Sequence, residues 1–371
     1  MKVCILSMQR VSNFGSVLQS YSLKKLIEEN GDSVSFIDIE PNREDDLLMN
    51  NNKSDYRSET DVANNFVEKL KHVDKYFFNR IWNKIRAAKQ EKEFQRFMND
   101  ELKLNKELIK EDYDWAVIGS DEVFNCMTSS PWGFTSQLFG NIKQAENIMT
   151  YAASCGTTTY EELPHPVKNK IKTSFEHIQH FSVRDKNTYS FVKKLTSKNI
   201  QYNLDPVLVG DFTKEMLACN FEPPNRRKYC IVYSYFNRIK DKNEINAIKK
   251  FCKEKRLEMV AIGAPQMWIS KFWVLTPFEV LEAFRMAEFV ITDTFHGTIF
   301  AAKYSARYAV MVRESNKNKL LDLIDRLDIR DHLISADNDL DQIYELKKTQ
   351  KLEEILKEER KKTKTYLSYI V

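Results

Sequence analysis

A polar turn between two apolar segments carries the residue types best suited to chemistry. The apolar run Phe289-Val290-Ile291 is typical of a buried parallel strand. Thr292-Asp-Thr-Phe-His-Gly297 follows it, and the chain then becomes apolar and rich in alanine again. This order predicts a strand, a tight turn and a new helix. Ligands of open α/β sheets bind at such strand ends, and free N–H groups at a helix start attract phosphate or carboxylate.

His296 stands in this turn, next to a glycine that lets the backbone approach a ligand. An imidazole binds an anion when it is charged and transfers a proton near neutral pH. The alternative is that His296 only caps the helix or fills the turn, which is the commoner outcome for an isolated histidine. The rest of the chain must therefore decide between the two interpretations.

Three other polar segments follow expected strands. Ser120-Asp121-Glu122 comes after the apolar run 115–119, Arg184 ends a short strand, and Asn13-Phe-Gly-Ser16 follows the first strand of the chain. Helix capping is a structural explanation for Asn13 and Ser16, and on their own it is the better one. A structural pair between Arg184 and Asp185 is less favoured, because adjacent residues of a strand point to opposite faces.

Strands and helices alternate in two stretches separated by the linker-like Pro223-Pro224-Asn225-Arg226-Arg227. We expect strands at 2–8, 33–39, 115–119, 147–154, 181–185, 229–236, 257–263, 289–291 and 308–312. We expect helices at 17–29, 243–255, 276–287, 318–327 and 343–366. Thr276, with proline after it and Glu279 three residues on, predicts a capping box.

The length of 371 residues is too great for one ordinary core. We expect a Rossmann-like domain over 1–210, a second over 225–340 and a helical tail over 341–371. An insertion at about 43–110 leaves the βαβ rhythm, with a polar loop over 42–61 and a basic amphipathic helix over 62–98. Such a helix can lie on an anionic membrane, but an inserted helical hairpin with a solvated charged face is the commoner case.

Composition excludes several classes of protein. The chain is 42% apolar and 30% charged, and its 57 basic and 53 acidic residues leave a net charge of +4, which does not indicate a dedicated nucleic-acid binder. None of the six cysteines forms a CxxC pair, so no zinc site or disulfide framework is visible. The start lacks the apolar length of a signal peptide, and no run approaches the ~20 residues of a membrane span. We expect a cytoplasmic protein.

Five motifs, taken together and in order, resemble the polysaccharide pyruvyl transferase family from about residue 3 to 330. They are Asn13-Phe-Gly-Ser-Val-Leu-Gln-Ser-Tyr21, Gly119-Ser-Asp-Glu-Val-Phe-Asn125, Ser182-Val-Arg-Asp185, Asp205-Pro206 and Thr292-Asp-Thr-Phe-His-Gly297. Each motif alone is weakly specific, whereas five in order are hard to obtain by chance.

The resemblance implies an α/β fold of two Rossmann-like, doubly wound domains facing across a cleft, similar to the glycosyltransferase-B fold. It implies transfer of a pyruvyl group from phosphoenolpyruvate to a sugar, as a cyclic ketal, with no cofactor or metal. The partners implied are this small donor and a saccharide acceptor, either a polysaccharide repeat unit or its lipid-linked precursor. Peripheral contact with the inner face of the membrane, and the oligomeric state, stay open.

The resemblance also implies roles for individual residues. His296 resembles the catalytic histidine, as general acid or phosphate partner; Arg184 resembles the arginine that holds phosphoenolpyruvate; Asp121 is a candidate base for a hydroxyl. The first domain would hold the acceptor and the second the donor. Candidate substrate-binding residues are Asn13, Phe14, Gly15, Ser16, Gln19, Ser120, Asn125, Asp293, Thr294, Gly297, Thr298 and, by a looser match, Arg313. The chain departs from the family in Glu122-Val-Phe, where many members have Gln-Val-Trp.

Two other functions fit the same pattern. A glycosyltransferase with a nucleotide-sugar donor would use the same cleft, with His296 beside the donor diphosphate, although no glutamate pair of the usual retaining-enzyme spacing follows it. A non-catalytic subunit of a polysaccharide assembly complex is the other, but a binding shell would not need Arg184, Asp121 and His296 together.

Overall fold

A computed structural model describes residues 1–49, 76–104, 112–126, 132–224, 227–335, 339–346 and 350–370, with side chains in the second range from residue 85. Most of the expected polar loop over 42–61 and the first part of the expected helix over 62–98 lie outside these residues. Where that loop is described, it begins with a short helix, α2 (Arg43–Leu47), because the Asn42 side chain accepts bonds from the N–H groups of Glu44 and Asp45.

The first half of the chain forms a six-stranded parallel sheet with the order β2-β1-β3-β4-β5-β6. Its strands are β1 (Lys2–Leu6), β2 (Ser33–Phe36), β3 (Tyr113–Asp121), β4 (Ala145–Ala153), β5 (Ile178–Val183) and β6 (Ile200–Tyr202). The central strand β3 is buried along most of its length, which explains its nearly continuous apolar sequence. The short edge strand β6 was not predicted.

The helices of the first half flank this sheet. They are α1 (Phe14–Glu28), α2, α4 (Tyr76–Asp100), α5 (His165–Phe175), α6 (Lys186–Lys193), α7 (Pro206–Val209) and α8 (Thr213–Ala218), with a 3-10 turn at Ser136–Phe139. The helix α1 begins three residues earlier than predicted, because the Asn13 side chain caps it by accepting a bond from the Ser16 N–H.

The second half forms a four-stranded parallel sheet with the order β10-β9-β7-β8. Its strands are β7 (Tyr229–Ser234), β8 (Glu258–Gly263), β9 (Phe289–Thr292) and β10 (Tyr308–Val310). Its helices are α9 (Lys242–Glu254), α10 (Pro277–Met286), α11 (Phe295–Tyr304), α12 (Lys317–Leu327) and α13 (Leu340–Tyr344), with 3-10 turns at Glu314–Asn316 and Arg330–His332. The predicted capping box of Thr276 and Glu279 is confirmed at the start of α10.

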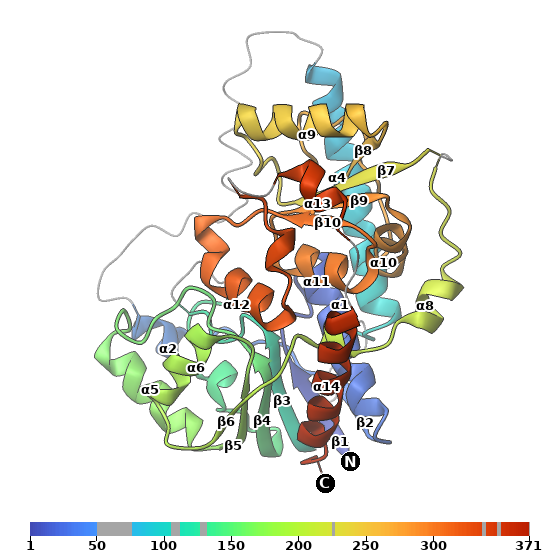
Figure 1. Cartoon of the computed structure of the whole chain (residues 1–371). Coiled ribbons are helices and arrows are strands. Elements are labelled where there is room, and N and C mark those ends of the chain that lie inside the picture. The colour runs from blue at the N-terminus through green and yellow to red at the C-terminus, as the bar shows by residue number, and fades with distance from the viewer. Residues whose placement is uncertain are drawn as a thin grey trace.

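The tail differs from the single helix expected over 343–366. It contains α13 and, after a gap in the described residues, α14 (Gln350–Leu367). Figure 1 shows α14 returning to the first sheet, where both chain ends lie. The Tyr366 hydroxyl donates to the carbonyl of Thr150 at 2.8 Å, and the hydroxyls of Thr363 and Tyr151 are 3.0 Å apart. The tail therefore joins the second half back to the first.

The helix α4 also connects the two halves. The Phe94 ring lies 4.8 Å from the ring of Phe14 in α1, and Phe97 lies 5.1 Å from Phe278 in α10. Gln90 donates to the Leu275 carbonyl at 2.8 Å and accepts from the same residue's N–H at 3.1 Å. The described part of the inserted helix is therefore packed against both halves through its apolar side.

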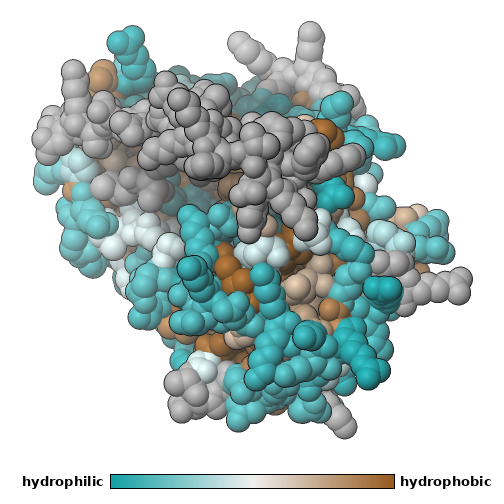
Figure 2. All heavy atoms as spheres, turned by 90° about the horizontal axis from the view of Figure 1, so that it is seen from above, coloured by the Kyte–Doolittle hydropathy of each residue, from teal (hydrophilic) through white to brown (hydrophobic). Residues whose placement is uncertain are grey.

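The described residues form three apolar clusters, one in each half and one that the two sheets share. A single buried cluster contains Val3 and Val117 of the first sheet together with Ile231 and Val290 of the second. Seen from above, the described surface is mostly hydrophilic, with apolar side chains limited to patches between hydrophilic ones (Figure 2). Within the described residues no helix is both long and apolar enough to cross a membrane. Two parallel α/β units joined in this way confirm the predicted fold class.

Candidate active site

A cavity of about 260 Å³ lies where strand ends of the two sheets meet. The helices α1 and α11 both begin at this cavity, so the positive ends of two helix dipoles face it. The described residues that line it are Met8, Val11, Asn13, Ser16, Asp121, Glu122, Asn125, Trp132, Arg184, Tyr235, Phe295, His296 and Lys319. Both halves of the chain therefore build the site.

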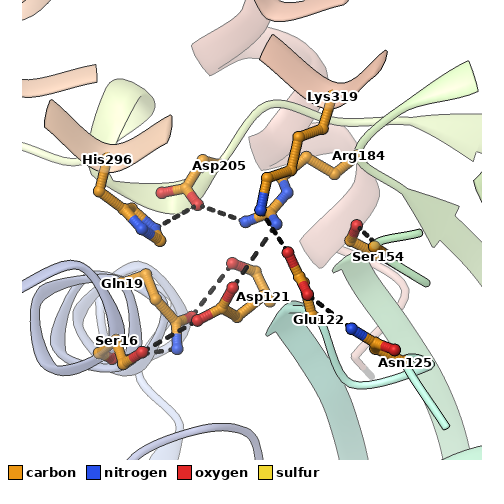
Figure 3. A network of polar contacts seen from close by, with 12 residues as sticks. Ser16, Gln19, Asp121, Glu122, Asn125, Ser154, Arg184, Asp205, His296 and Lys319 are labelled. Atoms are coloured by element: carbon orange, nitrogen blue, oxygen red, sulfur yellow. Dashed lines mark hydrogen bonds and ion pairs between the residues drawn. The ribbon is translucent and has the colours of Figure 1, made fainter. Parts of the chain in front are cut away.

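A chain of polar contacts crosses the cavity wall from α1 to α11 (Figure 3). The Ser16 hydroxyl donates to Asp121 Oδ2 at 3.0 Å, and Asp121 Oδ1 lies 3.5 Å from Arg184 Nη2. Arg184 Nη1 donates to Asp205 Oδ2 at 3.1 Å. The same oxygen lies 3.3 Å from His296 Nε2, close enough for an ion pair with the protonated ring. Two carboxylates thus alternate with an arginine and a histidine.

Arg184 is buried at the centre of this chain. Its side chain is 3% exposed, and its guanidinium lies over the ring of Phe295, 4.3 Å from the centroid. Burial opposes its charge, but the adjacent Asp121 and Asp205 outweigh burial and raise the pKa of Arg184. Its Nε is a buried donor without a hydrogen-bond partner among the described residues. The cation is thus fixed by carboxylates and keeps one donor unused.

The two carboxylates of this network, Asp205 with 0% and Asp121 with 13% of the side chain exposed, both favour the ionised form. Burial is the largest influence on the pKa of Asp121 and of Asp205 and raises it, but His296 and Arg184 together outweigh burial and lower both values. Asp205 also accepts a bond from the Val207 N–H, because it caps α7. Asp205 therefore binds a helix start, Arg184 and His296 at once.

His296 is positioned by both halves of the molecule. The Thr294 side chain caps α11 by accepting from the Gly297 N–H at 2.9 Å, which fixes the first turn of the helix. The other side of the ring lies against Gly15, where an added Cβ would come 2.1 Å from His296 Nδ1. The glycine of the Asn13–Ser16 motif is therefore required by close approach of α1 to the histidine.

Glu122 is neutralised across the cavity by Lys319 of α12, with which it forms an ion pair. Asn125 also donates to Glu122 Oε2 at 2.8 Å. Burial raises the pKa of Glu122 and is the largest influence, yet Lys319 and Asn125 outweigh it and lower the pKa. Where the family often has glutamine, this chain thus has a carboxylate that carries its own counter-ion.

A sequence profile of the polysaccharide pyruvyl transferase family matches residues 13–306. The chain belongs to this family. It is therefore a transferase that acts in polysaccharide modification by pyruvylation. The matched range is shorter at both ends than the expected 3–330. No curated protein sequence gives a significant match.

Several solved structures are similar in overall shape at low identity. The Staphylococcus aureus MnaA–UDP structure is 12% identical, with a TM-score of 0.47, and the match covers 92% of this chain and 86% of that one. For the Methanocaldococcus jannaschii UDP-GlcNAc 2-epimerase with UDP-GlcNAc and UDP, identity is 10%, TM-score 0.47 and coverage 96% and 99%. The Escherichia coli heptosyltransferase WaaC with ADP-2-deoxy-2-fluoro heptose is 10% identical, with a TM-score of 0.38, and the match covers 87% of this chain and 96% of that one.

The structure brings most of the family motifs to the cavity. Of the residues singled out from the sequence, Asn13, Ser16, Asp121, Asn125, Arg184 and His296 line it. Gly15 contacts His296 directly. Arg184 does not pair with its neighbour Asp185, which instead caps α6 and accepts a bond from the Ser154 hydroxyl.

Other predicted binding residues lie beneath the cavity. Gln19 is fully buried, donates to the Ser7 hydroxyl at 2.8 Å and accepts from the Ser120 hydroxyl at 3.1 Å. Phe14 belongs to the apolar core, and Thr298 bonds back to the Thr294 carbonyl. Thr294, Gly297 and Thr298 shape the first turn of α11. These residues are thus placed to support the site, not to line the cavity.

Arg313 and Asp293 are also absent from the cavity lining. Arg313 donates to both Glu244 carboxylate oxygens, at 2.7 and 3.0 Å, and to Asp293 Oδ2 at 3.1 Å. Asp293 is fully buried, and its carbonyl accepts from Asn316 at 2.8 Å. The expected second anion ligand therefore lies in an ion-pair network beside the turn.

Sequence reasoning missed several residues of the site. Asp205 was part of a quoted motif but not a candidate, because Asp before Pro is also an ordinary helix start. Lys319 gave no local signal, since it lies on an amphipathic helix whose other basic residues, Lys317 and Arg326, look the same in the sequence. Met8, Val11, Glu122, Trp132, Tyr235 and Phe295 complete the lining that was not predicted.

Proposed function

We propose that the protein uses this cavity to transfer the pyruvyl group of phosphoenolpyruvate to two hydroxyls of one sugar. That sugar belongs to a polysaccharide repeat unit or its lipid-linked precursor. The observation that supports this proposal most is that residues from separate sequence motifs meet at one cavity. Asn13, Asp121, Arg184, Asp205 and His296 come from five separate motifs of the family and meet around one cavity.

The overall reaction is balanced without a cofactor. A proton adds to the methylene carbon of phosphoenolpyruvate, which becomes a methyl group, and positive charge develops on the adjacent carbon. One sugar hydroxyl attacks that carbon and loses its proton. Phosphate leaves, a second hydroxyl attacks, and its proton is carried away by the phosphate. The products are a cyclic pyruvyl ketal and inorganic phosphate.

His296 is the proposed proton donor to the methylene carbon. Its Nε2 lies 3.3 Å from Asp205 Oδ2, so the buried carboxylate holds the ring in place. Gly15 allows the ring to sit at the start of α1. Asp121 is the proposed acceptor of the attacking hydroxyl's proton. Its lowered pKa keeps it ionised, which is the form that can accept a proton.

The anionic donor needs compensating charge. Arg184 and Lys319 supply two cations, each of which is already paired with a carboxylate, and the starts of α1 and α11 add their positive dipole ends. The volume of about 260 Å³ is below the range of roughly 300–1,000 Å³ typical of sites for drug-sized ligands. A donor as small as phosphoenolpyruvate suits it better than a nucleotide sugar.

Thermal unfolding with phosphoenolpyruvate, compared with a panel of nucleotide sugars, tests the donor. A ligand that binds only the folded state raises the melting temperature. We expect stabilisation by phosphoenolpyruvate that is lost in Arg184→Ala and retained in Arg313→Ala, the arginine outside the cavity. If Arg184→Ala does not fold, Lys319→Met replaces it.

The other outcomes have distinct meanings. Stabilisation by nucleotide sugars alone would replace the proposal with sugar transfer in the same cleft. Loss of turnover in a folded His296→Ala protein would exclude a purely binding role. Full turnover in that variant would remove His296 from the proton transfer.

A further inference from the structure

A second cavity, of about 190 Å³, lies in the first half of the molecule beside the active site. It is lined by Ser7, Gln9, Arg10, Asp38, Ile39 and Trp132. These residues follow β1 and β2, except for Trp132, which lines both cavities. One aromatic side chain therefore separates the second cavity from the charged site.

The floor of the second cavity is held rigidly. Gln9 is 1% exposed, accepts from the Ser7 N–H at 3.0 Å and donates to the Ile37 carbonyl at 2.8 Å. The Ser7 hydroxyl donates to the Ser120 carbonyl at 3.1 Å, directly before Asp121. The ends of β1, β2 and β3 are thus tied together beneath the cavity.

An ion pair between Arg10 and Asp38 lies at the edge of the second cavity. Arg10 bonds to both carboxylate oxygens of Asp38, with Nη2 to Oδ2 at 2.9 Å and a second bond from Nε to Oδ1. The side chains are 45% and 32% exposed, so a ligand can reach them. The pair has no net charge and offers donors and acceptors together. This chemistry matches hydroxyl groups better than phosphate or carboxylate.

We propose that the second cavity binds a neutral sugar unit of the acceptor, adjacent to the sugar that receives the pyruvyl group. The negative face of the Trp132 ring attracts the weakly positive C–H groups of a sugar ring, and Arg10 and Asp38 bind its hydroxyls. The reacting sugar then lies beyond Trp132, next to Asp121. The assignment rests on the proposed function, because it takes the first cavity as the place of transfer.

This arrangement predicts what the enzyme selects. The charged cavity holds the donor and one sugar, while the second cavity binds the next sugar along the saccharide. A disaccharide therefore binds more tightly than either of its monosaccharides. Specificity for the neighbouring unit lies in Arg10, Asp38 and Trp132, none of which belongs to the five family motifs.

Saturation-transfer NMR with the full-length protein tests the assignment. The probes are methyl glycosides of glucose, galactose, mannose, N-acetylglucosamine and N-acetylgalactosamine, and disaccharides of the same units. We expect at least one disaccharide to bind, with affinity at least tenfold lower in Trp132→Ala and Asp38→Asn. Trp132→Phe should retain part of the affinity, because it keeps an aromatic face.

Two control variants change similar side chains elsewhere. Tyr369→Ala removes an exposed aromatic ring of the tail, and Arg96→Met removes the exposed partner of Asp100 on α4. Both should bind the disaccharide as the wild type does. Disaccharide affinity that is unchanged in Trp132→Ala and Asp38→Asn overturns the assignment, as does absence of binding by every probe.

Phosphoenolpyruvate separates this proposal from the proposed function. Stabilisation by phosphoenolpyruvate should be equal in the wild type and Asp38→Asn, because Asp38 lines only the second cavity, whereas Trp132 lines both. If the variants lose saccharide binding while phosphoenolpyruvate stabilises no form, the sugar site stands and the donor assignment fails. If phosphoenolpyruvate binding falls together with saccharide binding in Asp38→Asn, the second cavity is not a separate acceptor site.

Discussion

Two arginines show what distinguishes a site residue from a structural one in this fold. Arg184 directly follows β5, and Arg313 lies shortly after β10; each is held by two carboxylates. Asp205 and Asp121 bind Arg184, whereas Glu244 and Asp293 bind Arg313. Yet only Arg184 lines the cavity, with 3% of its side chain exposed, against 21% for Arg313.

The difference lies in how the guanidinium donors are used. In Arg313, Nε, Nη1 and Nη2 all donate to carboxylate oxygens. In Arg184 the contacts run through Nη1 and Nη2, and Nε has no hydrogen-bond partner among the described residues. The carboxylates of Arg184 also connect it to Ser16 and His296. The two arginines thus differ in two ways: Arg184 lines the cavity, and one of its guanidinium donors has no hydrogen-bond partner among the described residues.

Arg184→Met should have the largest effect. It leaves Asp121 and Asp205 buried without their arginine, and breaking a buried pair in this way costs about 3–5 kcal/mol. We expect turnover to be lost and the free energy of unfolding in urea to fall by that order. Arg184→Lys keeps the charge and should recover part of the stability. A loss below about 1 kcal/mol in Arg184→Met would show that the buried carboxylates do not depend on Arg184.

The pH dependence of this loss follows from the carboxylates. The pKa of Asp121 and of Asp205 is lowered in the folded protein, so their ionised forms contribute stability above the unfolded value near 3.9. This stability is lost as the pH falls through the folded pKa values. The unfolding free energies of wild type and Arg184→Met should therefore differ most at neutral pH and converge below about pH 4. A difference that stays constant down to pH 2 would contradict this origin.

Gly15→Ala should have the next largest effect, on catalysis more than on stability. Its Cβ would lie 2.1 Å from His296 Nδ1, so the ring must move. Displacement of a reacting group by about 1 Å costs on the order of 100-fold in rate. Gly210→Ala is the matched control, because its Cβ would lie 2.1 Å from the Ser22 hydroxyl, outside the cavity lining. Equal losses of turnover in the two variants would mean that crowding, not His296 placement, is responsible.

The sequence predicted the fold well because its signals are local. Apolar runs marked nine of the ten strands in the described residues, and the missed β6 has only three residues at a sheet edge. The capping residues Asn13 and Thr276 were recognised for the same reason. The return of α14 to the first sheet was not specified, because it depends on contacts such as Tyr366 with Thr150, 216 positions apart.

Residues of the cavity lining were predicted only where they belong to a recognised sequence motif. His296, Arg184 and Asp121 follow strands, and the order of strands in the sheets decides which strand ends meet. The pairing of Glu122 with Lys319 joins residues 197 positions apart, on elements of different halves. The ion pairs of Arg313 could not be predicted for the same reason: its position after a strand is visible in the sequence, whereas its pairing with Glu244 is not.

Glu122→Gln and Lys319→Met should shift donor affinity by several-fold in opposite directions. If Lys319 binds the anionic donor, its pairing with Glu122 competes with that binding. Removing the Glu122 charge then lowers the KM for phosphoenolpyruvate, and removing the Lys319 charge raises it. If the Glu122–Lys319 ion pair only holds the two halves of the protein together, both variants weaken donor binding to the same extent. Steady-state kinetics of the two variants and of the double variant distinguish these cases.

Arg313→Met should have the smallest effect on activity and completes the comparison. The pair with Glu244 is partly exposed, and the buried Asp293 keeps a second arginine, Arg238, at 3.7 Å. The loss should therefore cost less than that of Arg184, about 1–2 kcal/mol. The KM for phosphoenolpyruvate should stay within twofold of the wild type, because Arg313 does not line the cavity. Glu244→Gln tests whether the pair acts as a unit, since it should lower stability without changing KM. A tenfold rise in KM in Arg313→Met, with Glu244→Gln unchanged, would instead show that Arg313 leaves its carboxylates to bind the donor, and the two arginines would then share one role.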